Sequence, residues 1–517
     1  RVTVISSNFV SLILITSMSM CIHLIVRYRE LHIDSPNASQ WSLVKNTVDH
    51  MFKPCLYMAL TTMVAFNSLI FSGIRPVIDF GWMMATGIMV ALCVVFIFFP
   101  VLVLLVGKRT ESDNVKQHSP MTDFFEFITL KHGRKLIAAN ILFFVIVVMG
   151  LAKLDVENSF INYFHESTEI HQGMQVIDKS LGGTTPLEVI LNFPVVVDDW
   201  EDEDGDDFFF DEDESEQEDS TKYWFTAEKL ARIKSVHQYL DSLPEVGKVL
   251  SLATMMQVAE NISGEKLGSF EMALLYGAIP VEFKSIVLDP YVAPEHGQAR
   301  ISIRIYDSLP DLKRAKLLQK IEEDIQHELG FKRDEFELAG MMVLYNNMLQ
   351  SLFQSQILTM GAVFIGIMLM FMILFRSWKL AVIAIVPNLL SAGAVLSVMG
   401  WIGIPLDMMT ITIAAISIGI AVDNTIHYIH RFREEFAVVK NYEQAVRNCH
   451  ASIGKAVFYI SITIIVGFSI LALSNFIPTI YFGLLIGLSM LIALVQVLTL
   501  LPRMLIIFKP FGEQSNP

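Results

Sequence analysis

Long apolar runs separated by short polar turns dominate this chain. Several runs exceed the roughly 18 residues that suggest a helix crossing a bilayer, and 53% of the residues are hydrophobic. The pattern predicts a polytopic α-helical membrane protein. We expect nine spanning helices, at about residues 2–26, 54–72, 77–106, 135–152, 352–375, 380–400, 406–430, 456–474 and 479–508.

Basic residues flank one end of these helices and are nearly missing from the other. At the other end, the turns 73–77, 401–406 and 475–479 contain a single basic residue, Arg75. Because cytoplasmic loops are enriched in lysine and arginine, the basic side is expected to be cytoplasmic. The basic flanks are Arg27/Arg29, Lys108/Arg109, Lys131/Arg134/Lys135, Arg376/Lys379, Arg431/Arg433 and Arg503/Lys509.

The helices repeat within the chain. Residues 22–30 (IHLIVRYRE) match residues 426–434 (IHYIHRFRE) at an offset of 404 residues. Further on, an offset of 402 residues pairs Thr61, Phe66, Pro76 and Gly81 with Thr463, Phe468, Pro478 and Gly483. Such a duplication is common in transporters. We therefore expect two pseudo-symmetric helix repeats.

A region between the predicted spans, residues 153–350, has a different pattern. Residues 187–193 and 299–305 alternate as half-buried strands, and residues 226–243 and 312–329 read as amphipathic helices. The region is expected to be one exported α+β domain. None of the four cysteines (Cys21, Cys55, Cys93, Cys449) lies in it, so no disulfide framework is implied.

An acidic insert, residues 198–219, accounts for the net charge. It holds fifteen Asp and Glu and no Lys or Arg, against a net charge of −15 for the chain. The rest is balanced, so no nucleic-acid partner is implied. A calcium loop of the EF-hand type fails because Trp200 would occupy the first ligand position. We expect no metal site and a solvated, disordered loop that is dispensable for folding, with docking of residues 208–210 on lipid or a partner as the alternative.

Asp423 and Asn424 lie in the interior of the predicted helix 406–430. A carboxylate at that depth costs several kcal/mol, and such residues usually mark an ion path or a proton relay. A structural carboxylate satisfied by neighbouring helices is the alternative. Gly419 and His427 lie one turn to either side, the glycine allowing close helix packing and the histidine adding a titratable group.

The segment GIAVD at residues 419–423, followed by Asn424 and His427 and by RFREE at 431–435, resembles the GxxxD signature of resistance-nodulation-division (RND) transporters. Its branch is the MMPL/Patched-like one, which shares the sterol-sensing-domain fold. The resemblance implies a proton-driven exporter with Asp423 as the carrier and a periplasmic porter-like domain. It also implies a fragment that lacks the first three spans and the first exported domain.

This resemblance gives an expected domain map. The map runs from the last spans of the first membrane repeat (1–107) through a cytoplasmic linker with an amphipathic helix (108–134), the first span of the second repeat (135–152), the periplasmic domain (153–350) and the remaining spans (351–510) to a cytoplasmic tail (511–517).

The two repeats differ at the acidic position, because the offset of 404 aligns Ser19 with Asp423. We therefore predict a relay with one acid. Asp423 is the protonatable group, with Asn424 and His427 as hydrogen-bond partners. Thr463 on the following span is a further candidate hydrogen-bond partner of Asp423. The alternative is that its hydroxyl bonds to the backbone of its own helix, as threonines in helices often do.

Ser19 and His23 are expected to form the opposing polar wall of this relay. For both His23 and His427 the alternative is a position at the membrane interface, beside the cytoplasmic arginines. The helices 2–26 and 407–430 are expected to pack side by side at the centre of the bundle, because duplicated helices take equivalent places about a pseudo-two-fold axis.

The expected function is export of a hydrophobic or lipid substrate, driven by protons, in a bacterial inner membrane. The first alternative is a Patched-like sterol- or lipid-binding regulator without net transport, and the second is a structural subunit that organises membrane partners. The chain carries no Walker A, G-x-S-x-G or HExxH motif, so neither an enzyme nor a cofactor is expected. Membrane lipids are expected partners, and a homo-oligomer or a periplasmic partner stays open.

Overall fold

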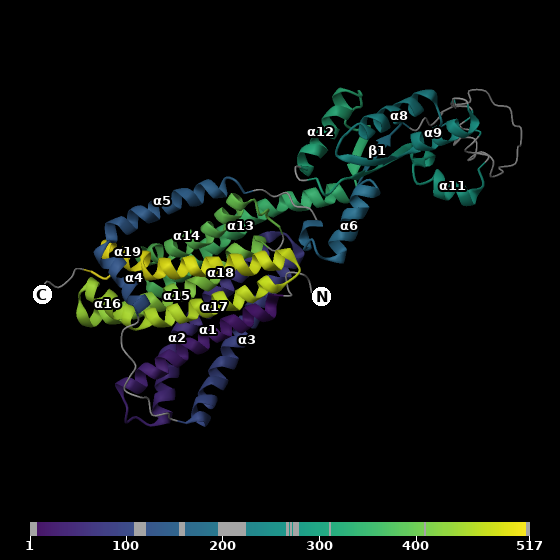
Figure 1. Cartoon of the computed structure of the whole chain (residues 1–517). Coiled ribbons are helices and arrows are strands. Elements are labelled where there is room, and N and C mark those ends of the chain that lie inside the picture. Colours follow the sequence, from purple (N-terminus) through teal and green to yellow (C-terminus); the bar gives the residue numbers. More distant parts are fainter. Residues whose placement is uncertain are drawn as a thin grey trace, which may run out of the picture. The chain divides into compact units, whose positions relative to one another are not determined.

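The computed structural model describes residues 8–107, 120–154, 161–194, 224–264, 268, 271, 274, 279–309, 312–407 and 410–512. The chain divides into two compact units, one formed by residues 1–158 and 350–517 and the other by residues 159–349. We call them the helical unit and the α+β unit (Figure 1). The acidic insert 198–219 lies outside the described residues.

The described residues contain nine helices long and apolar enough to span a membrane, which confirms the predicted polytopic helical fold. Each of the nine overlaps one predicted span. They are α1 (Phe9–Asp34), α2 (Gln40–Asn67), α3 (Arg75–Val106), α5 (Gly133–Leu151), α13 (Met341–Phe375), α14 (Trp378–Ile402), α15 (Thr410–Val439), α17 (Ile453–Ser469) and α18 (Ile477–Leu498), the last continued by α19 (Leu500–Phe508).

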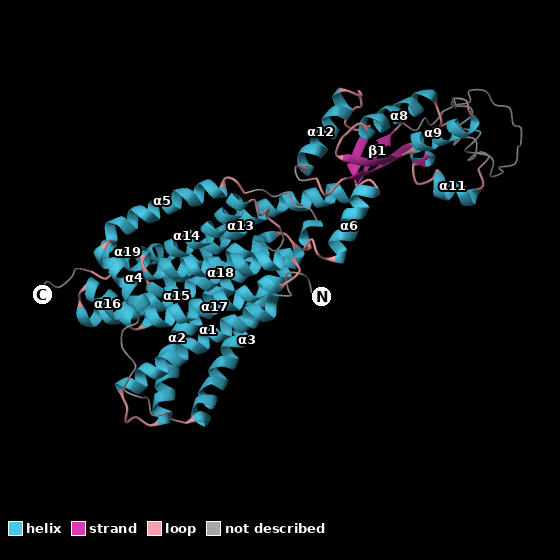
Figure 2. Ribbon diagram, viewed as in Figure 1, coloured by secondary structure: helices cyan, strands magenta, loops and turns pink. Residues whose placement is uncertain are grey.

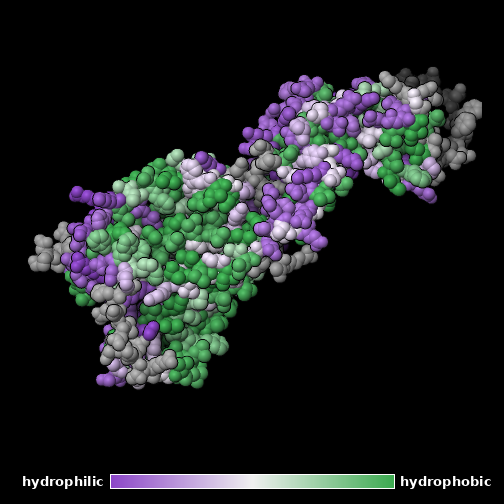
Figure 3. Space-filling view, viewed as in Figure 1, coloured by the Kyte–Doolittle hydropathy of each residue, from purple (hydrophilic) through white to green (hydrophobic). Residues whose placement is uncertain are grey.

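The surface of the helical unit is suited to lipid. Figure 3 shows an apolar face over its long helices, with hydrophilic side chains gathered at the end that carries α16 (Tyr442–Ala451). The short helix α4 (Pro120–Lys131) packs against α16 at that end. It exposes Phe124 and Phe127 while Thr122 and Thr129 are buried, as expected for an amphipathic helix in the membrane interface.

The internal duplication is visible in matching contacts. A Cβ added to Gly81 would lie 2.6 Å from the carbonyl oxygen of Phe66, and one added to Gly483 would lie 2.5 Å from that of Phe468. The backbone N–H of Ile74 donates to Ser72 Oγ at 3.2 Å, as that of Phe476 does to Ser474 Oγ at 3.1 Å. In both repeats the glycine lets α3 or α18 approach the end of the preceding helix.

The repeats are interleaved in space. Helix α15 packs mainly against α2, α18 and α14, and α1 packs mainly against α3, α2 and α17. Each central helix therefore lies against a helix of the other repeat, α15 against α2 and α1 against α17. This crossing decides which side chains surround Asp423.

The α+β unit contains a small sheet, whose strands are magenta in Figure 2. The sheet is antiparallel, and its order is β2-β4-β1-β5. Its strands are β1 (Thr185–Asn192), β2 (Val246–Leu250), β3 (Val292–Ala293, paired with β4), β4 (Gln298–Ile305) and β5 (Phe336–Ala339). Its helices are α6 (Glu169–Ser180), α8 (Ala227–Asp241), α9 (Leu252–Ser263), α11 (Val281–Val287) and α12 (Arg314–His327). The predicted strands and amphipathic helices of this region are confirmed.

Strand alternation places the core of this unit on one face of the sheet. Leu187 and Val189 of β1 and Ile301 of β4 are fully buried and pack in one apolar cluster with residues of α8 and α12. On the opposite face Arg300 donates to both carboxylate oxygens of Glu188, at 2.7 and 3.0 Å. The period of two that predicted these strands thus also divides apolar from charged contacts.

Candidate functional site

Asp423 lies in the middle of α15, the most enclosed of the spanning helices. The helix begins after Asp407, whose carboxylate accepts from the backbone N–H of Thr410 at 2.7 Å while the Thr410 hydroxyl accepts from the N–H of Asp407 at 2.7 Å. This reciprocal cap fixes where the helix starts. Sixteen residues after Asp407, Asp423 is only 4% exposed, so its carboxyl group is removed from both lipid and bulk water.

The hydrogen-bond partner of Asp423 comes from the other repeat. Thr62 Oγ1 of α2 lies 3.3 Å from Asp423 Oδ1, 3.3 Å from the carbonyl oxygen of Gly419 and 2.8 Å from that of Met58. A hydroxyl carries one hydrogen that rotates between these acceptors. Thr62 can therefore donate to an ionised Asp423, and can return to the carbonyl of Met58 when the acid is protonated.

Gly419 makes this contact possible. A Cβ added to Gly419 would lie only 2.9 Å from the Cβ of Ala65 on α2. The absence of a side chain lets the two helices approach closely, which is the use of glycine in membrane helix packing. Gly419 thus lies at the close contact between α15 and α2.

Neighbouring polar residues hold α15 to two further helices. Asn424 donates through Nδ2 to Ser461 Oγ of α17 at 3.2 Å. Asn388 of α14 donates through Nδ2 to Thr425 Oγ1 at 3.1 Å. All of these side chains are buried. Helix α15, which carries Asp423, therefore has polar hydrogen bonds to α2, α14 and α17.

The predicted opposing wall meets α15 through a pair of imidazole rings. His23 of α1 stacks on His427 of α15, with ring centroids 3.7 Å apart and planes inclined by 19°. Both residues are buried, at 2% and 4% exposure, and they lie near Arg27 and Arg431, as the alternative of a position beside the basic residues also requires. Ser19, one turn before His23, is also buried, and its hydroxyl has no hydrogen-bond partner among the described residues.

The structure does not bring Thr463 to Asp423. Its hydroxyl donates to the carbonyl oxygen of Tyr459 on its own helix at 2.8 Å, the alternative that the sequence left open. The reason is the crossing of the repeats: α15 packs closely against α2 and only slightly against α17. Thr61 is the counterpart of Thr463 in the first repeat, and the partner of Asp423 is the next residue, Thr62. The sequence analysis did not consider Thr62.

Ser461 and Asn388 were also missed, because single polar residues in apolar runs give no indication of which helix they face. Cys55 of α2 is a further buried neighbour, close enough to Asp423 to interact with its charge. Among the described residues no group of three or more His, Cys, Asp or Glu is placed to hold a metal ion. The carboxyl group of Asp423 and the hydroxyl and amide groups around it can exchange a proton and form hydrogen bonds.

Known proteins with similar sequences are membrane proteins. A membrane protein of Methanocaldococcus jannaschii is 31% identical over 154 residues, which cover 30% of this chain and 40% of that protein. The hopanoid transporter HpnN of Burkholderia multivorans is 31% identical over 117 residues, covering 22% of this chain and 13% of HpnN. The matched regions thus span less than half of either relative.

Solved structures with the same fold include two membrane proteins. The hedgehog release protein Disp of the water bear Hypsibius dujardini superposes with a TM-score of 0.58 at 13% identity, covering 96% of this chain and 62% of Disp. SecDF of Thermus thermophilus, a translocon-associated membrane protein, superposes with a TM-score of 0.53 at 13% identity, covering 97% of this chain and 54% of SecDF.

The sequence profile of the MMPL family matches residues 2–128 and 246–516. These ranges include every described spanning helix except α5, and with them Ser19, His23, Thr62, Asp423 and His427. The predicted RND-type fold and its MMPL branch are confirmed. The chain belongs to the MMPL family, a family of multi-pass membrane transporters.

Proposed function

We propose that the chain is a proton-driven exporter of a hydrophobic or lipid substrate, with Asp423 as the group that takes up and releases the proton. One observation carries the proposal: a carboxyl group buried at the centre of the bundle whose described neighbours supply a hydroxyl and no cation. A permanent charge in that place is costly unless it is paired. A group that can become neutral avoids this cost, and the two states of Asp423 make different demands on Thr62.

The relay is proposed to have a single acid. Asp423 exchanges the proton, Thr62 donates to its ionised form, and Asn424 ties the same turn of α15 to α17. Ser19 occupies the equivalent place on α1 and adds a hydroxyl but no charge. Because α15 is bonded to helices of both repeats, neutralising Asp423 would weaken the α15–α2 contact and let the repeats shift against each other.

One relative supports the proposed substrate class. HpnN is a hopanoid transporter, so we take hopanoids or similar apolar lipids as the first candidates for this chain. Lipids of the membrane can reach the apolar face of the helical unit directly. We place the basic flanks, among them Arg27 and Arg431, on the cytoplasmic side of the cell membrane and the α+β unit on the outer, periplasmic side.

Reconstitution of the chain in proteoliposomes tests the proposal. A pH gradient is imposed, and two signals are followed: the internal pH with an enclosed dye, and transfer of a labelled hopanoid to acceptor vesicles. The wild-type chain is expected to couple the two signals, and Asp423→Asn is expected to abolish both while folding normally. Thr463→Val serves as the matched control, because its hydroxyl bonds to its own helix.

Wild-type rates in Asp423→Asn would overturn the proposal. Hopanoid binding by the wild-type chain without gradient-dependent movement would instead favour a Patched-like regulator that binds lipid without net transport. Loss of folding in Asp423→Asn would favour a structural carboxylate, and thermal unfolding in detergent separates that outcome from a loss of coupling.

A further inference from the structure

A polar cavity opens at the basic end of the helical unit and reaches the stacked histidines. Its volume is about 60 Å³, enough for water to enter. Its mouth is formed by exposed and half-buried charged residues, and His23 and His427 form its floor. The lining comes from α1, α2, α15 and α17: His23, Val26, Arg27, Glu30, His50, Met51, Pro54, His427, His430, Arg431, Glu434 and Ile453.

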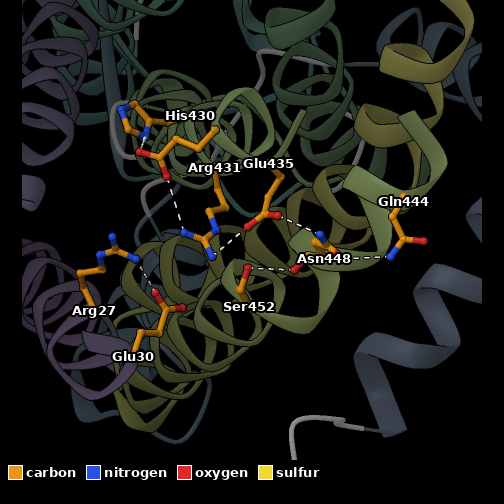
Figure 4. A network of polar contacts seen from close by, with 9 residues as sticks. Arg27, Glu30, His430, Arg431, Glu435, Gln444, Asn448 and Ser452 are labelled. Atoms are coloured by element: carbon orange, nitrogen blue, oxygen red, sulfur yellow. Dashed lines mark hydrogen bonds and ion pairs between the residues drawn. The ribbon is translucent and has the colours of Figure 1, made fainter. Parts of the chain in front are cut away.

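Ion pairs fix the rim of this cavity (Figure 4). Arg27 donates to Glu30 at 2.9 Å on α1. Arg431 on α15 contacts Glu435 at 2.9 Å, and Glu435 accepts from Asn448 of α16 at 2.8 Å. These bonds hold the end of α15 to α16 and keep the charged heads at the rim. The floor is left to the two imidazole rings.

The rings at the floor have unused hydrogen-bonding capacity. Neither ring nitrogen of His23 has a partner among the described residues, and the same holds for Nε2 of His427. Buried polar atoms normally find a partner, and the two residues that carry these nitrogens line a space that water can enter. His427 lies one turn from Asp423 on the same face of α15, so the histidine stack stands between the cavity and the acid.

We infer that this cavity is the cytoplasmic mouth of the proton path and that the His23–His427 stack is its gate. The inference rests on the proposed function, since the gate controls access to Asp423. When both rings are neutral they stack and close the floor. A proton on one ring makes it a donor that seeks water or Asp423, and two protonated rings at 3.7 Å would repel each other.

The groups that face the stack belong to every helix around it. Helix α1 contributes Arg27 and Glu30, α2 contributes His50, and α17 contributes the apolar Ile453. Helix α15 itself contributes His430, Arg431 and Glu434. The arginines are paired with glutamates, so the stack is surrounded by nearly balanced charge and its own protonation decides whether it opens.

Helix α2 offers one labelling position on each side of the proposed gate. Met51 and Pro54 line the cavity, whereas Cys55, one turn after Met51 on α2 in the direction of Thr62, is fully buried and is not part of the lining. A thiol at position 51 is therefore in front of the gate, and the thiol of Cys55 is behind it. Both can be followed with a charged, membrane-impermeant methanethiosulfonate reagent on the full-length chain.

The test uses a background in which Cys21, Cys93 and Cys449 are replaced by serine, leaving Cys55. Cys55 is expected to react slowly in inside-out vesicles, and at least about tenfold faster in His427→Ala or in His23→Ala, because removal of either ring opens the floor. In a second background with Cys55→Ser, Met51→Cys is expected to react rapidly from the cytoplasmic side alone. His132→Ala, a histidine outside the cavity, is the matched control.

Rapid labelling of Cys55 with both histidines in place would overturn the gate, as would continued protection in both alanine variants. A Met51→Cys thiol that reacts only from the opposite side, or not at all, would overturn the cavity as the cytoplasmic mouth. These readouts do not depend on transport. Retained export in Asp423→Asn would remove the proposed function even if the labelling pattern held, so the two failures are distinguishable.

Discussion

His23 and His427 occupy equivalent positions in the two helix repeats, and their rings stack with centroids 3.7 Å apart. The pair bridges α1 and α15, which otherwise pack mainly against other helices, so the predicted side-by-side packing of these two helices is not found. One turn earlier in each helix the symmetry ends, because α1 has Ser19 at the position where α15 has Asp423. Both repeats thus contribute a histidine to the stacked pair, but only α15 contributes an acid. This difference is the basis for the proposed relay with one carboxyl group.

Replacement of Thr62 by valine removes the hydroxyl that reaches Asp423 and keeps the shape of the side chain. A hydrogen bond to a charged group contributes about 1.5–3 kcal/mol, so we expect proton-coupled export to slow by about tenfold or more. Thr463→Val is the matched control and is expected to retain the wild-type rate. Equal rates in the two variants, measured in proteoliposomes with a pH gradient, would remove Thr62 from the site.

Gly419→Ala is expected to force α15 and α2 apart. The added Cβ would lie 2.9 Å from that of Ala65, whereas one added to Gly361 of α13 meets no atom within 4 Å. Both changes gain about 1 kcal/mol of helix propensity, so their difference isolates the clash, which costs about 1–3 kcal/mol. Thermal unfolding in detergent should show a lower midpoint for Gly419→Ala than for Gly361→Ala. An equal midpoint would contradict the close contact.

Asp178 should make the α+β unit sensitive to acid. Burial alone would raise the pKa of Asp178, but hydrogen bonds from Ser308, Asp307 and Thr184 outweigh it and hold the pKa below its usual range. A lowered native pKa means that this stabilisation is complete above about pH 4 and is lost as the pH falls toward the native value. The unit is therefore expected to loosen below about pH 4.

Hydrogen exchange of the β1 and β4 amides measures this effect in the full chain. Asp178→Ala leaves buried donors without an acceptor and should weaken protection at pH 7 by about 3 kcal/mol, with little further loss in acid. Glu282→Gln, at an exposed position of α11, is the control and should behave as the wild type does. If Asp178→Ala keeps the acid dependence of the wild-type chain, a group other than Asp178 causes the loosening in acid.

Much of the fold could be predicted from the sequence because apolar run length and the internal repeat are one-dimensional signals. They gave the nine spans, the equivalence of His23 with His427, and the contrast of Ser19 with Asp423. The partner of Asp423 could not be obtained in this way. Thr62 and Thr463 lie in corresponding helices, and only the crossing of α2 onto α15 decides between them. The cavity in front of the histidines likewise depends on side chains from four helices.

The central claim is that Asp423 changes its protonation state inside the bundle. Infrared difference spectroscopy of the reconstituted chain tests it most directly, because a protonated carboxylic acid has a carbonyl stretch that a carboxylate lacks. We predict a pH-dependent carbonyl band in the wild-type chain that is missing in Asp423→Asn and shifted in Thr62→Val, which alters its hydrogen bonding. Identical spectra for the wild-type chain and Asp423→Asn would contradict the claim.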